Sequence, residues 1–204
     1  MKYNISFTKV QHSNIGIVDF NNIPFGRIFS DHMFIADYEN GEWINPRIEP
    51  VSDINMHPSN LTLHYGQAIF EGMKAFKTKK GEANIFRLKD HAKRFNESAH
   101  RMCMPDFPED LFCEALSKLI GIDAQWIPPV LGSALYVRPF MFATSEFLGV
   151  MPSEKYRFMV IACPVGPYYA KPVSLLAETH FVRAVNGGVG EAKCAGNYAA
   201  SLLP

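Results

Sequence analysis

The pattern of apolar and polar positions predicts several strands in this chain. Residues 28–38 mix Phe, Ile and Tyr with polar residues, as in a half-buried strand. Residues 134–144 and 156–163 predict two further strands. The last of these is almost continuously apolar, so we expect it to be buried on both faces.

Between these strands the pattern indicates a hairpin and a region without long elements. Residues 71–77 and 83–88 flank Lys79–Glu82, which predicts two strands joined by a tight turn. Residues 42–57 contain Pro46, Pro50 and several Asp and Asn residues. This composition predicts a loop or short extended pieces.

Two helices are predicted after the hairpin. Asp90 is suited to cap the first, in which Ala92, Phe95, Ala99 and Met102 recur at helical spacing. Pro108, followed by Glu109 and Asp110, predicts the start of the second. The apolar residues of the second helix are Leu111, Phe112, Ala115, Leu116 and Leu119.

A run of helix-breaking residues follows the last strand and indicates a domain boundary. Pro164, Gly166, Pro167 and Pro172 interrupt the pattern. We therefore predict a domain over residues 1–166, a linker over 167–174 and the incomplete start of a second domain over 175–204. In this last part we expect a short strand near 174–178, a glycine-rich stretch at 187–196 and a helix from about Asn197.

Composition excludes several classes of function. Lys plus Arg equals Asp plus Glu, at 20 each, so no basic excess points to nucleic acid. No apolar run approaches the roughly 18 residues of a membrane span, and the polar start at Met1–Ile5 lacks a signal-peptide pattern. Four scattered cysteines favour reduced thiols in the cytoplasm. The histidines lack metal-ligand spacing, so we expect no metal site.

Lys193 is the first candidate for chemistry. It lies in GGVGEAKCAGNYAASLL (187–203), where four glycines permit positive φ and close approach of a ligand. The stretch matches neither the phosphate-loop motif nor the dinucleotide motif of nucleotide-binding proteins. A lysine held this way can form imines with carbonyl compounds, although a solvated loop lysine is the alternative.

Two arginines are further candidates. Alternation along the strand at 134–144 places Tyr136, Arg138, Phe140 and Phe142 on one face, where Arg138 could bind a carboxylate in an apolar pocket. The alternative is that this face is simply exposed. Arg94 falls in the first turn of its predicted helix, where a cation opposes the dipole. It could have an anionic partner or could be a solvated arginine.

These segments together resemble one family. They are FSDHM (29–33), LHYGQAIFEGMKAF (63–76), the helix around Arg94, LYVRP (135–139), PVGPY (164–168) and the Lys193 motif. In order and spacing they resemble the fold-type-IV pyridoxal-phosphate aminotransferases, and within these the branched-chain amino acid aminotransferases, over nearly all of residues 25–203. The resemblance implies an α+β fold, with a small N-terminal domain of mostly antiparallel sheet and helices followed by the truncated start of a second, β-rich domain.

The resemblance also implies roles for individual residues. Lys193 is expected to form a Schiff base with pyridoxal 5'-phosphate, Tyr198 to hydrogen-bond its phenolic oxygen and Arg94 to hold its phosphate. Arg183 is expected to line the cofactor site. The residues expected around the substrate are Phe25, Tyr65, Phe70, Tyr136, Arg138 and Tyr168. Ala195 departs from the family, which often has a glycine there, but a small residue should be tolerated.

The implied reaction transfers the amino group of L-leucine, L-isoleucine or L-valine to 2-oxoglutarate. One pocket must then accept both an aliphatic side chain and a carboxylate. The segment Leu148-Gly149-Val150 resembles a loop that reaches the active site of the other subunit, which implies a homodimer.

Members of the family continue well past the lysine helix. We therefore expect this chain to be the N-terminal part of such an enzyme and to be poorly active alone. Two alternatives remain at this stage. One is a D-amino acid aminotransferase or aminodeoxychorismate lyase of the same fold, and the other is a non-catalytic dimerisation module.

Overall fold

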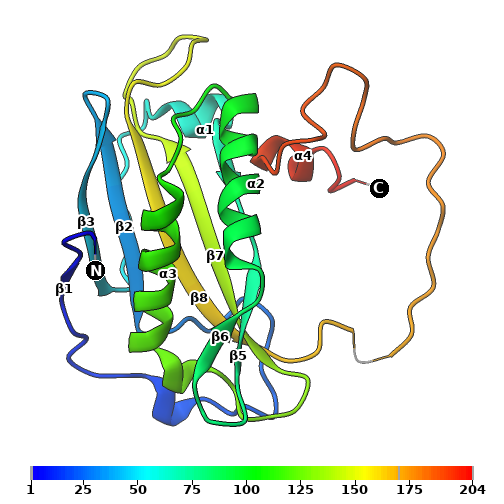
Figure 1. Ribbon diagram of the computed structural model, residues 1–204. Helices are drawn as coiled ribbons and strands as arrows, with labels where there is room; N and C mark the ends of the chain where they lie inside the picture. The colour runs from blue at the N-terminus through cyan, green and yellow to red at the C-terminus, as the bar shows by residue number, and fades with distance from the viewer. Residues whose placement is uncertain (1, 170, 204) are drawn as a thin grey trace.

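The computed structural model describes residues 2–169 and 171–203, in which two helices cover one face of a sheet (Figure 1). The strands are β1 (Ser6–Phe7), β2 (His32–Glu39), β3 (Glu42–Pro50), β4 (Ala68–Phe70), β5 (Met73–Lys77), β6 (Ala83–Ile85), β7 (Ala134–Ala143) and β8 (Tyr156–Val165). The α-helices are α1 (Leu61–Tyr65), α2 (Leu88–Arg101), α3 (Glu109–Ile122) and α4 (Ala195–Ala199). Short 3-10 turns, η1 (Ile15–Ile17) and η2 (Ala124–Trp126), complete the elements.

The sheet is mostly antiparallel, as the family resemblance implies. Its strand order is β1-β3-β2-β8-β7-β5-β6, and β4 pairs with the far part of β7. The pairs β2–β8, β7–β8 and β5–β7 are antiparallel, whereas β1 runs parallel to β3. The long β7–β8 pair, from Ala134↔Val165 to Ala143↔Tyr156, forms the centre of the sheet. The α+β prediction is therefore confirmed.

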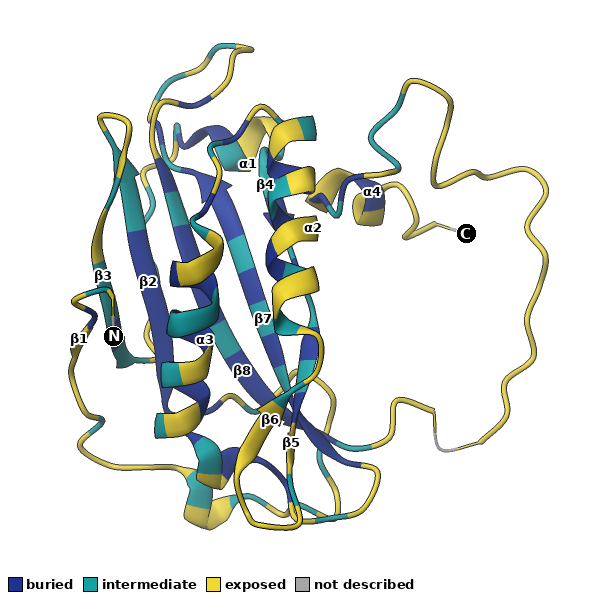
Figure 2. Cartoon of the chain, viewed as in Figure 1, coloured by how far each residue is buried: buried dark blue, intermediate teal, exposed yellow. Residues whose placement is uncertain are grey.

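The core lies between the sheet and helices α2 and α3. Figure 2 shows that the inward sides of both helices and the central strands are buried. Phe158 of β8 is stacked on Phe107 at 3.8 Å between ring centroids and meets Phe95 of α2 edge-on at 5.4 Å. Burial of such aromatic side chains contributes about 1.5–3 kcal/mol each. This packing fixes α2 against β8.

Both predicted helices exist, but the first begins earlier than expected. It starts at Leu88, with Arg87 in the left-handed region at φ 54° as its N-cap. Asp90 lies inside the first turn and accepts a 2.5 Å hydrogen bond from Arg87 Nε. An acidic residue is stabilising within the first turn as well as at the cap, which explains the displaced prediction. The second helix starts at Glu109 after Pro108, as predicted.

Two strand predictions need correction, whereas the β5–β6 hairpin is confirmed, although its second strand ends at Ile85 and not at residue 88. The strand predicted at 28–38 starts at His32 and ends at Glu39. Residues 42–50, predicted as a loop, form strand β3. Pro46 is tolerated because the register shifts between Ile35 and Asp37, opposite it, and Asn45 adopts φ 53°. A bulge of this kind accommodates a residue that has no N–H to donate.

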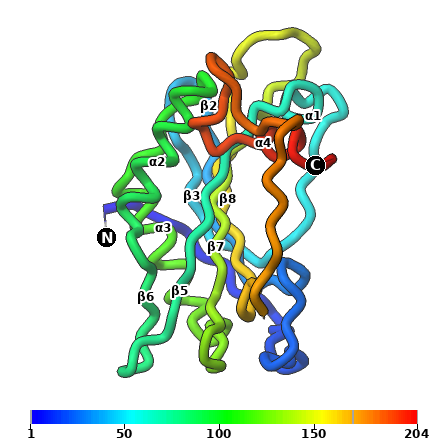
Figure 3. The backbone as a smooth tube through the Cα atoms, turned by 90° about the vertical axis from the view of Figure 1, so that its right-hand side faces the viewer, coloured from blue at the N-terminus to red at the C-terminus, as the bar shows by residue number. Residues whose placement is uncertain are grey.

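The chain leaves the sheet after β8 and returns to it at α4. Figure 3 shows this segment running back along the molecule to α4. The strand predicted near 174–178 does not form, because these residues have no neighbouring strand and are exposed. The helix predicted from Asn197 forms as α4, two residues earlier. None of the described helices is long and apolar enough to span a membrane.

Candidate active site

A cavity of about 570 Å³ lies on the face of the sheet opposite helices α2 and α3. Leu135 and Val137 of β7 pack into the core beneath the helices, so alternation directs Tyr136 and Arg138 to the other face. The cavity is lined by Phe25, Phe70, Lys74, Tyr136, Arg138, Val165, Gly166, Tyr168, Lys193, Ala195 and Tyr198. The predicted two-faced arrangement of β7 is therefore confirmed.

The backbone around Lys193 is held from two sides. Its N–H donates to Ser98 Oγ of α2 at 3.0 Å, and its carbonyl accepts from the N–H of Phe70 at 3.0 Å. The neighbouring Cys194 is fully buried and forms an isolated bridge with Ile69 of β4. These contacts attach the lysine segment to the edge strand β4 and to α2.

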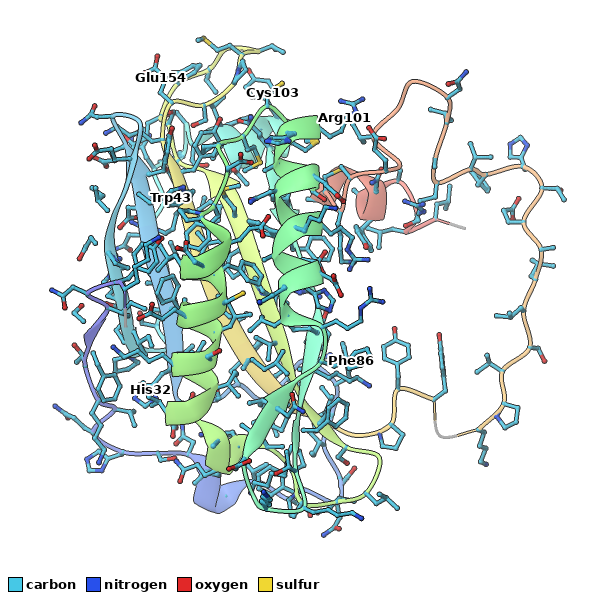
Figure 4. The ribbon with its side chains drawn as sticks, in the orientation of Figure 1. His32, Trp43, Phe86, Arg101, Cys103 and Glu154 are labelled. Carbon is cyan, nitrogen blue, oxygen red and sulfur yellow. The ribbon has the colours of Figure 1, made fainter. Side chains whose placement is uncertain are left out.

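Arg101 fixes the loop that precedes Lys193. It lies at the end of α2 and faces the returning segment in Figure 4. One of its terminal nitrogens donates to the carbonyl of Gly188 at 2.9 Å, and its Nε lies 3.4 Å from a carboxylate oxygen of Glu191. The glycine-rich stretch is therefore attached to the helix at residues 188–191 and again at Lys193.

The Lys193 ammonium lies among aromatic side chains inside the cavity. Its Nζ donates to Tyr198 Oη at 2.8 Å and lies 4.7 Å from the centre of the Phe70 ring. The Phe70 and Tyr198 rings pack against each other at 4.8 Å. A cation over a ring face is favourable, and the tyrosine hydroxyl fixes its direction.

A second cation, Arg138, is held by the same aromatic wall. Its guanidinium lies 4.4 Å above the Phe70 ring and donates to Tyr136 Oη at 2.7 Å. Its Nε is buried without a hydrogen-bond partner among the described residues. A buried donor without a partner is costly, so this nitrogen is suited to an acceptor brought by a ligand.

The Tyr136 side chain depends on Gly72. A Cβ at position 72 would lie 2.1 Å from Tyr136 Oη, so only glycine leaves room for this hydroxyl. Phe25 and Tyr168 complete the aromatic lining, with ring centroids 5.2 Å apart. The result is a pocket with apolar walls and hydroxyl and cationic groups at its base.

Arg94 has a partner that the sequence did not reveal. Its guanidinium donates from Nε and Nη2 to the two carboxylate oxygens of Glu71, at 2.5 and 2.8 Å. The Glu71 side chain is fully buried and also meets His91 Nδ1 at 2.8 Å. Burial alone would raise the pKa of Glu71, but the hydrogen bonds from Arg94 and His91 outweigh it and lower that pKa.

The same ion pair acts on the arginine. The hydrogen bond to Glu71 raises the pKa of Arg94, with burial opposing it. Because α2 begins at Leu88, Arg94 falls in the second turn and not the first. Arg94 is therefore not a cation in the first turn opposed by the helix dipole, and Glu71 is its anionic partner.

Seven of the predicted site residues lie together around the cavity: Phe25, Phe70, Tyr136, Arg138, Tyr168, Lys193 and Tyr198. Three others do not line it. Arg94 lies beside Glu71, Tyr65 is exposed at the end of α1, and Arg183 donates to the carbonyl of Gly190 at 3.4 Å. The cofactor roles of Arg94 and Arg183 and the substrate role of Tyr65 stay predictions.

Lys74, Glu71 and Ser98 were missed by sequence reasoning as site residues. Lys74 lines the cavity, Glu71 orients Arg94 and Ser98 holds the Lys193 backbone. Strand alternation could have indicated Lys74 once β5 was paired with β7. Nothing local in the sequence indicates the other two, because their partners are 23 and 95 residues away.

The chain resembles known proteins over most of its length. No protein-family model matches it. It is 48% identical over 189 residues to branched-chain-amino-acid transaminase 1 of Bacillus subtilis, covering 90% of this chain and 53% of that protein. It is 46% identical over 187 residues to the branched-chain-amino-acid aminotransferase of Mycolicibacterium smegmatis, covering 89% and 51%. The chain thus spans about half the length of the curated relatives it matches.

Solved structures give the same result. A T.th. branched-chain amino acid aminotransferase complexed with N-(5'-phosphopyridoxyl)-L-glutamate superposes with a TM-score of 0.65 at 28% identity, covering 87% of this chain and 54% of that one. The Escherichia coli enzyme gives 0.61 at 25% identity, covering 85% and 54%. Over about nine-tenths of its length, the chain is therefore a homologue of the N-terminal half of the fold-type-IV branched-chain amino acid aminotransferases.

Proposed function

We propose that this chain provides the lysine-bearing half of a branched-chain amino acid aminotransferase. The proposed reaction moves the amino group of L-leucine, L-isoleucine or L-valine to 2-oxoglutarate, using pyridoxal 5'-phosphate. The observation that carries the proposal is Lys193 Nζ, 2.8 Å from Tyr198 Oη, inside an aromatic pocket that also holds Arg138. The relatives from Bacillus subtilis and Mycolicibacterium smegmatis are named as branched-chain enzymes, which favours this reaction over those of D-amino acid enzymes or lyases.

The side chains present fit the cofactor. The amine of Lys193 faces the cavity, where it can condense with the aldehyde of pyridoxal phosphate. Tyr198 Oη, bonded to this amine, would lie within reach of the phenolic oxygen of the cofactor. Arg94 uses two of its three guanidinium nitrogens for Glu71, which leaves Nη1 for a phosphate oxygen. When bound, pyridoxal phosphate supplies the electron sink that makes loss of the α-proton feasible.

The chain's own residues position the substrate and move its proton. Once the substrate amine has displaced it, Lys193 Nζ is free to take the α-proton of the substrate. It can then deliver this proton, within the same pocket, to the carbon that carried the cofactor's aldehyde. Phe70 prevents water from reaching one side of that amine, since its ring lies 4.7 Å from Nζ. Arg138 and Tyr136 offer donors to a carboxylate, while Phe25, Phe70 and Tyr168 provide apolar surface for an aliphatic side chain.

Ligands of related enzymes support both kinds of substrate. One relative of known structure binds a phosphopyridoxyl adduct of L-glutamate. The same enzyme was also solved with 4-methylvaleric acid, which has a branched aliphatic end, and that structure superposes with a TM-score of 0.62. We infer that the present pocket accepts the same two classes of side chain.

A homodimer and a cytoplasmic location are also part of this proposal. Leu148 and Val150, in the loop between β7 and β8, are 70% and 90% exposed, as expected if a second subunit covers them. The four cysteines are free thiols, which suits a reducing compartment.

Cofactor attachment tests the proposal directly. The chain is incubated with pyridoxal phosphate, reduced with borohydride and digested, and the modified peptide is mapped by mass spectrometry. We expect a single stoichiometric adduct on Lys193 and none on Lys193→Met. Scattered labelling of the exposed lysines, such as Lys79 and Lys80, would contradict the proposal.

Substrate choice needs a second experiment on the loaded chain before reduction. L-leucine, L-isoleucine and L-valine should convert the bound aldehyde to the amine form, slowly because the chain spans about half the length of its relatives, and 2-oxoglutarate should reverse the change. Both steps are followed by absorbance. A preference for D-leucine would instead support a D-amino acid aminotransferase.

A further inference from the structure

The pocket around Lys193 holds a third cation with no role in the proposal above. Besides Lys193 and Arg138, Lys74 lines the cavity, and none of the eleven described lining residues is acidic. The carboxylate nearest to Lys74 along the chain is Glu71, which is fully buried and bonded to Arg94 and His91. The cavity is therefore positively charged and is suited to an anionic ligand.

The register of the sheet places Lys74 beside Tyr136. Lys74 of β5 pairs directly with Tyr136 of β7, so the two side chains leave the same face with Cβ atoms about 5 Å apart. Its neighbours Met73 and Ala75 are buried in the core on the helix side. The N–H of Phe86 donates to the carbonyl of Lys74 at 3.5 Å. Figure 4 shows Phe86 at the edge of the sheet that faces the segment leaving β8.

Lys74 has no anionic partner of its own. It is half-buried, yet its ammonium takes part in none of the ion pairs among residues 2–169 and 171–203. The Tyr136 hydroxyl does not cover it, because that group is turned over Gly72 and bonded to Arg138. An unpaired ammonium beside a cavity is available to a ligand carboxylate.

Two cations beside the reacting lysine match the two carboxylates of a dicarboxylic acid. Arg138, with its unpartnered Nε, provides for one of them. We propose that Lys74 binds a second carboxylate, so that the pocket holds glutamate or 2-oxoglutarate at both ends and a branched monocarboxylate at only one. This inference rests on the proposed function for its substrates, and it makes Lys74 a residue that determines specificity between the two substrate classes.

Binding of inert acids measures this selectivity. The chain is titrated calorimetrically with glutarate and with 4-methylvalerate. Each titration is done once without cofactor and once with the cofactor reduced onto Lys193, which gives four affinities. We expect Lys74→Met to weaken glutarate binding about tenfold, the effect of one charge-assisted hydrogen bond, and to leave 4-methylvalerate binding within about twofold. Lys74→Arg should restore the glutarate affinity.

Lys77 offers a matched control. It lies on the same strand, carries the same charge and is exposed outside the cavity, so Lys77→Met should change neither affinity. Equal weakening of both acids by Lys74→Met would overturn the proposal, because Lys74 would then bind a group common to both. No effect of Lys74→Met, or no glutarate binding by the unmodified chain, would overturn it as well.

Chemical footprinting separates this inference from the proposed function. Acetylation of lysine amines, read by mass spectrometry, should be slowed by glutarate at Lys74 but not at Lys77, and 4-methylvalerate should protect neither. Glutarate protection of Lys74 in a chain that pyridoxal phosphate fails to label at Lys193 would refute the proposed function alone. Labelling of Lys193 without protection of Lys74 would refute the present inference alone.

Discussion

Glu71 is the residue whose removal should most disturb the neighbourhood of the site. Its buried carboxylate accepts from Arg94, His91 and the Gly72 N–H. Glu71→Gln should lower the free energy of unfolding by about 2–3 kcal/mol, below the value for a fully buried pair because Arg94 is 52% exposed. Urea unfolding measures this, with Glu82→Gln, an exposed hairpin-turn variant, expected to change stability by under about 0.5 kcal/mol.

The effect of Glu71 should depend on pH. Its pKa is lowered from the ordinary value of 4.5, because the hydrogen bonds from Arg94 and His91 outweigh burial. Its stabilising contribution is therefore complete above pH 4.5 and is lost as pH falls through the lower pKa of the folded state. The difference in the free energy of unfolding between wild type and Glu71→Gln should therefore disappear at acid pH. A gap that stays constant would show that the carboxylate charge is not responsible.

Gly72 should be essential for the shape of the pocket. In Gly72→Ala the new Cβ would meet Tyr136 Oη, so the ring must move and its hydrogen bond to Arg138 must break. We expect weaker binding of both glutarate and 4-methylvalerate, by at least about tenfold for glutarate, measured by calorimetry. Gly121→Ala in α3 meets nothing within 4 Å and should stabilise the chain slightly. Unchanged binding by Gly72→Ala would show that Tyr136 does not shape the site.

Single residues differ in how far the sequence reveals them. Alternation along one strand was enough to put Tyr136 and Arg138 on a common face, because β7 is regular over its whole length. The partner of Arg94 was not predictable in this way. Glu71 reaches it across the sheet edge, and only the path of the chain brings residues 71 and 94 together.

At the level of elements, α2 acts as the support for the lysine segment. Ser98 is buried and holds the Lys193 N–H at 3.0 Å. Ser98→Ala should cost about 1 kcal/mol and raise the hydrogen exchange of the Lys193 amide, because this donor loses its acceptor. Hydrogen exchange read by mass spectrometry over residues 187–199 tests this. Ser117→Ala, exposed on α3, is the control, and equal exchange in both variants would contradict the assigned support.

Elements were predictable where the local pattern agreed with the tertiary environment. The β5–β6 hairpin, α3 and the central strands β7 and β8 follow from their own residues. Strand β3 does not, because its prolines predict a loop when the segment is considered alone. It forms a strand because it pairs with β2, where the register shift accommodates Pro46. The segment near 174–178 has the composition of a strand but no partner, so it stays outside the sheet.

For the whole molecule, the site opens on the face of the sheet that the helices leave uncovered. One side of the sheet is covered by α2 and α3 (Figure 1). The other side carries Tyr136, Arg138 and Lys74, which line the cavity. The side chains at the cavity come from β4, β5, β7, β8, α4 and connecting segments, one of which, between η1 and β2, carries Phe25. No single stretch of sequence could therefore define the cavity, although its aromatic and cationic composition was predictable in large part.

The exposed loop between β7 and β8 gives the last prediction, which concerns assembly. Leu148 and Val150 are large apolar residues with little contact to their own chain, and exposure of such residues side by side is unfavourable in water. If a second subunit covers them, Leu148→Glu with Val150→Glu should shift the chain from dimer to monomer in sedimentation velocity, because two charges would be buried without partners. Leu131→Glu, 99% exposed in the loop before β7, should leave the dimer intact. Neither Leu148 nor Val150 lines the cavity, so the double variant should keep its fold and an intact site around Lys193. A dimer that persists in the double variant would place the subunit contact elsewhere on the molecule.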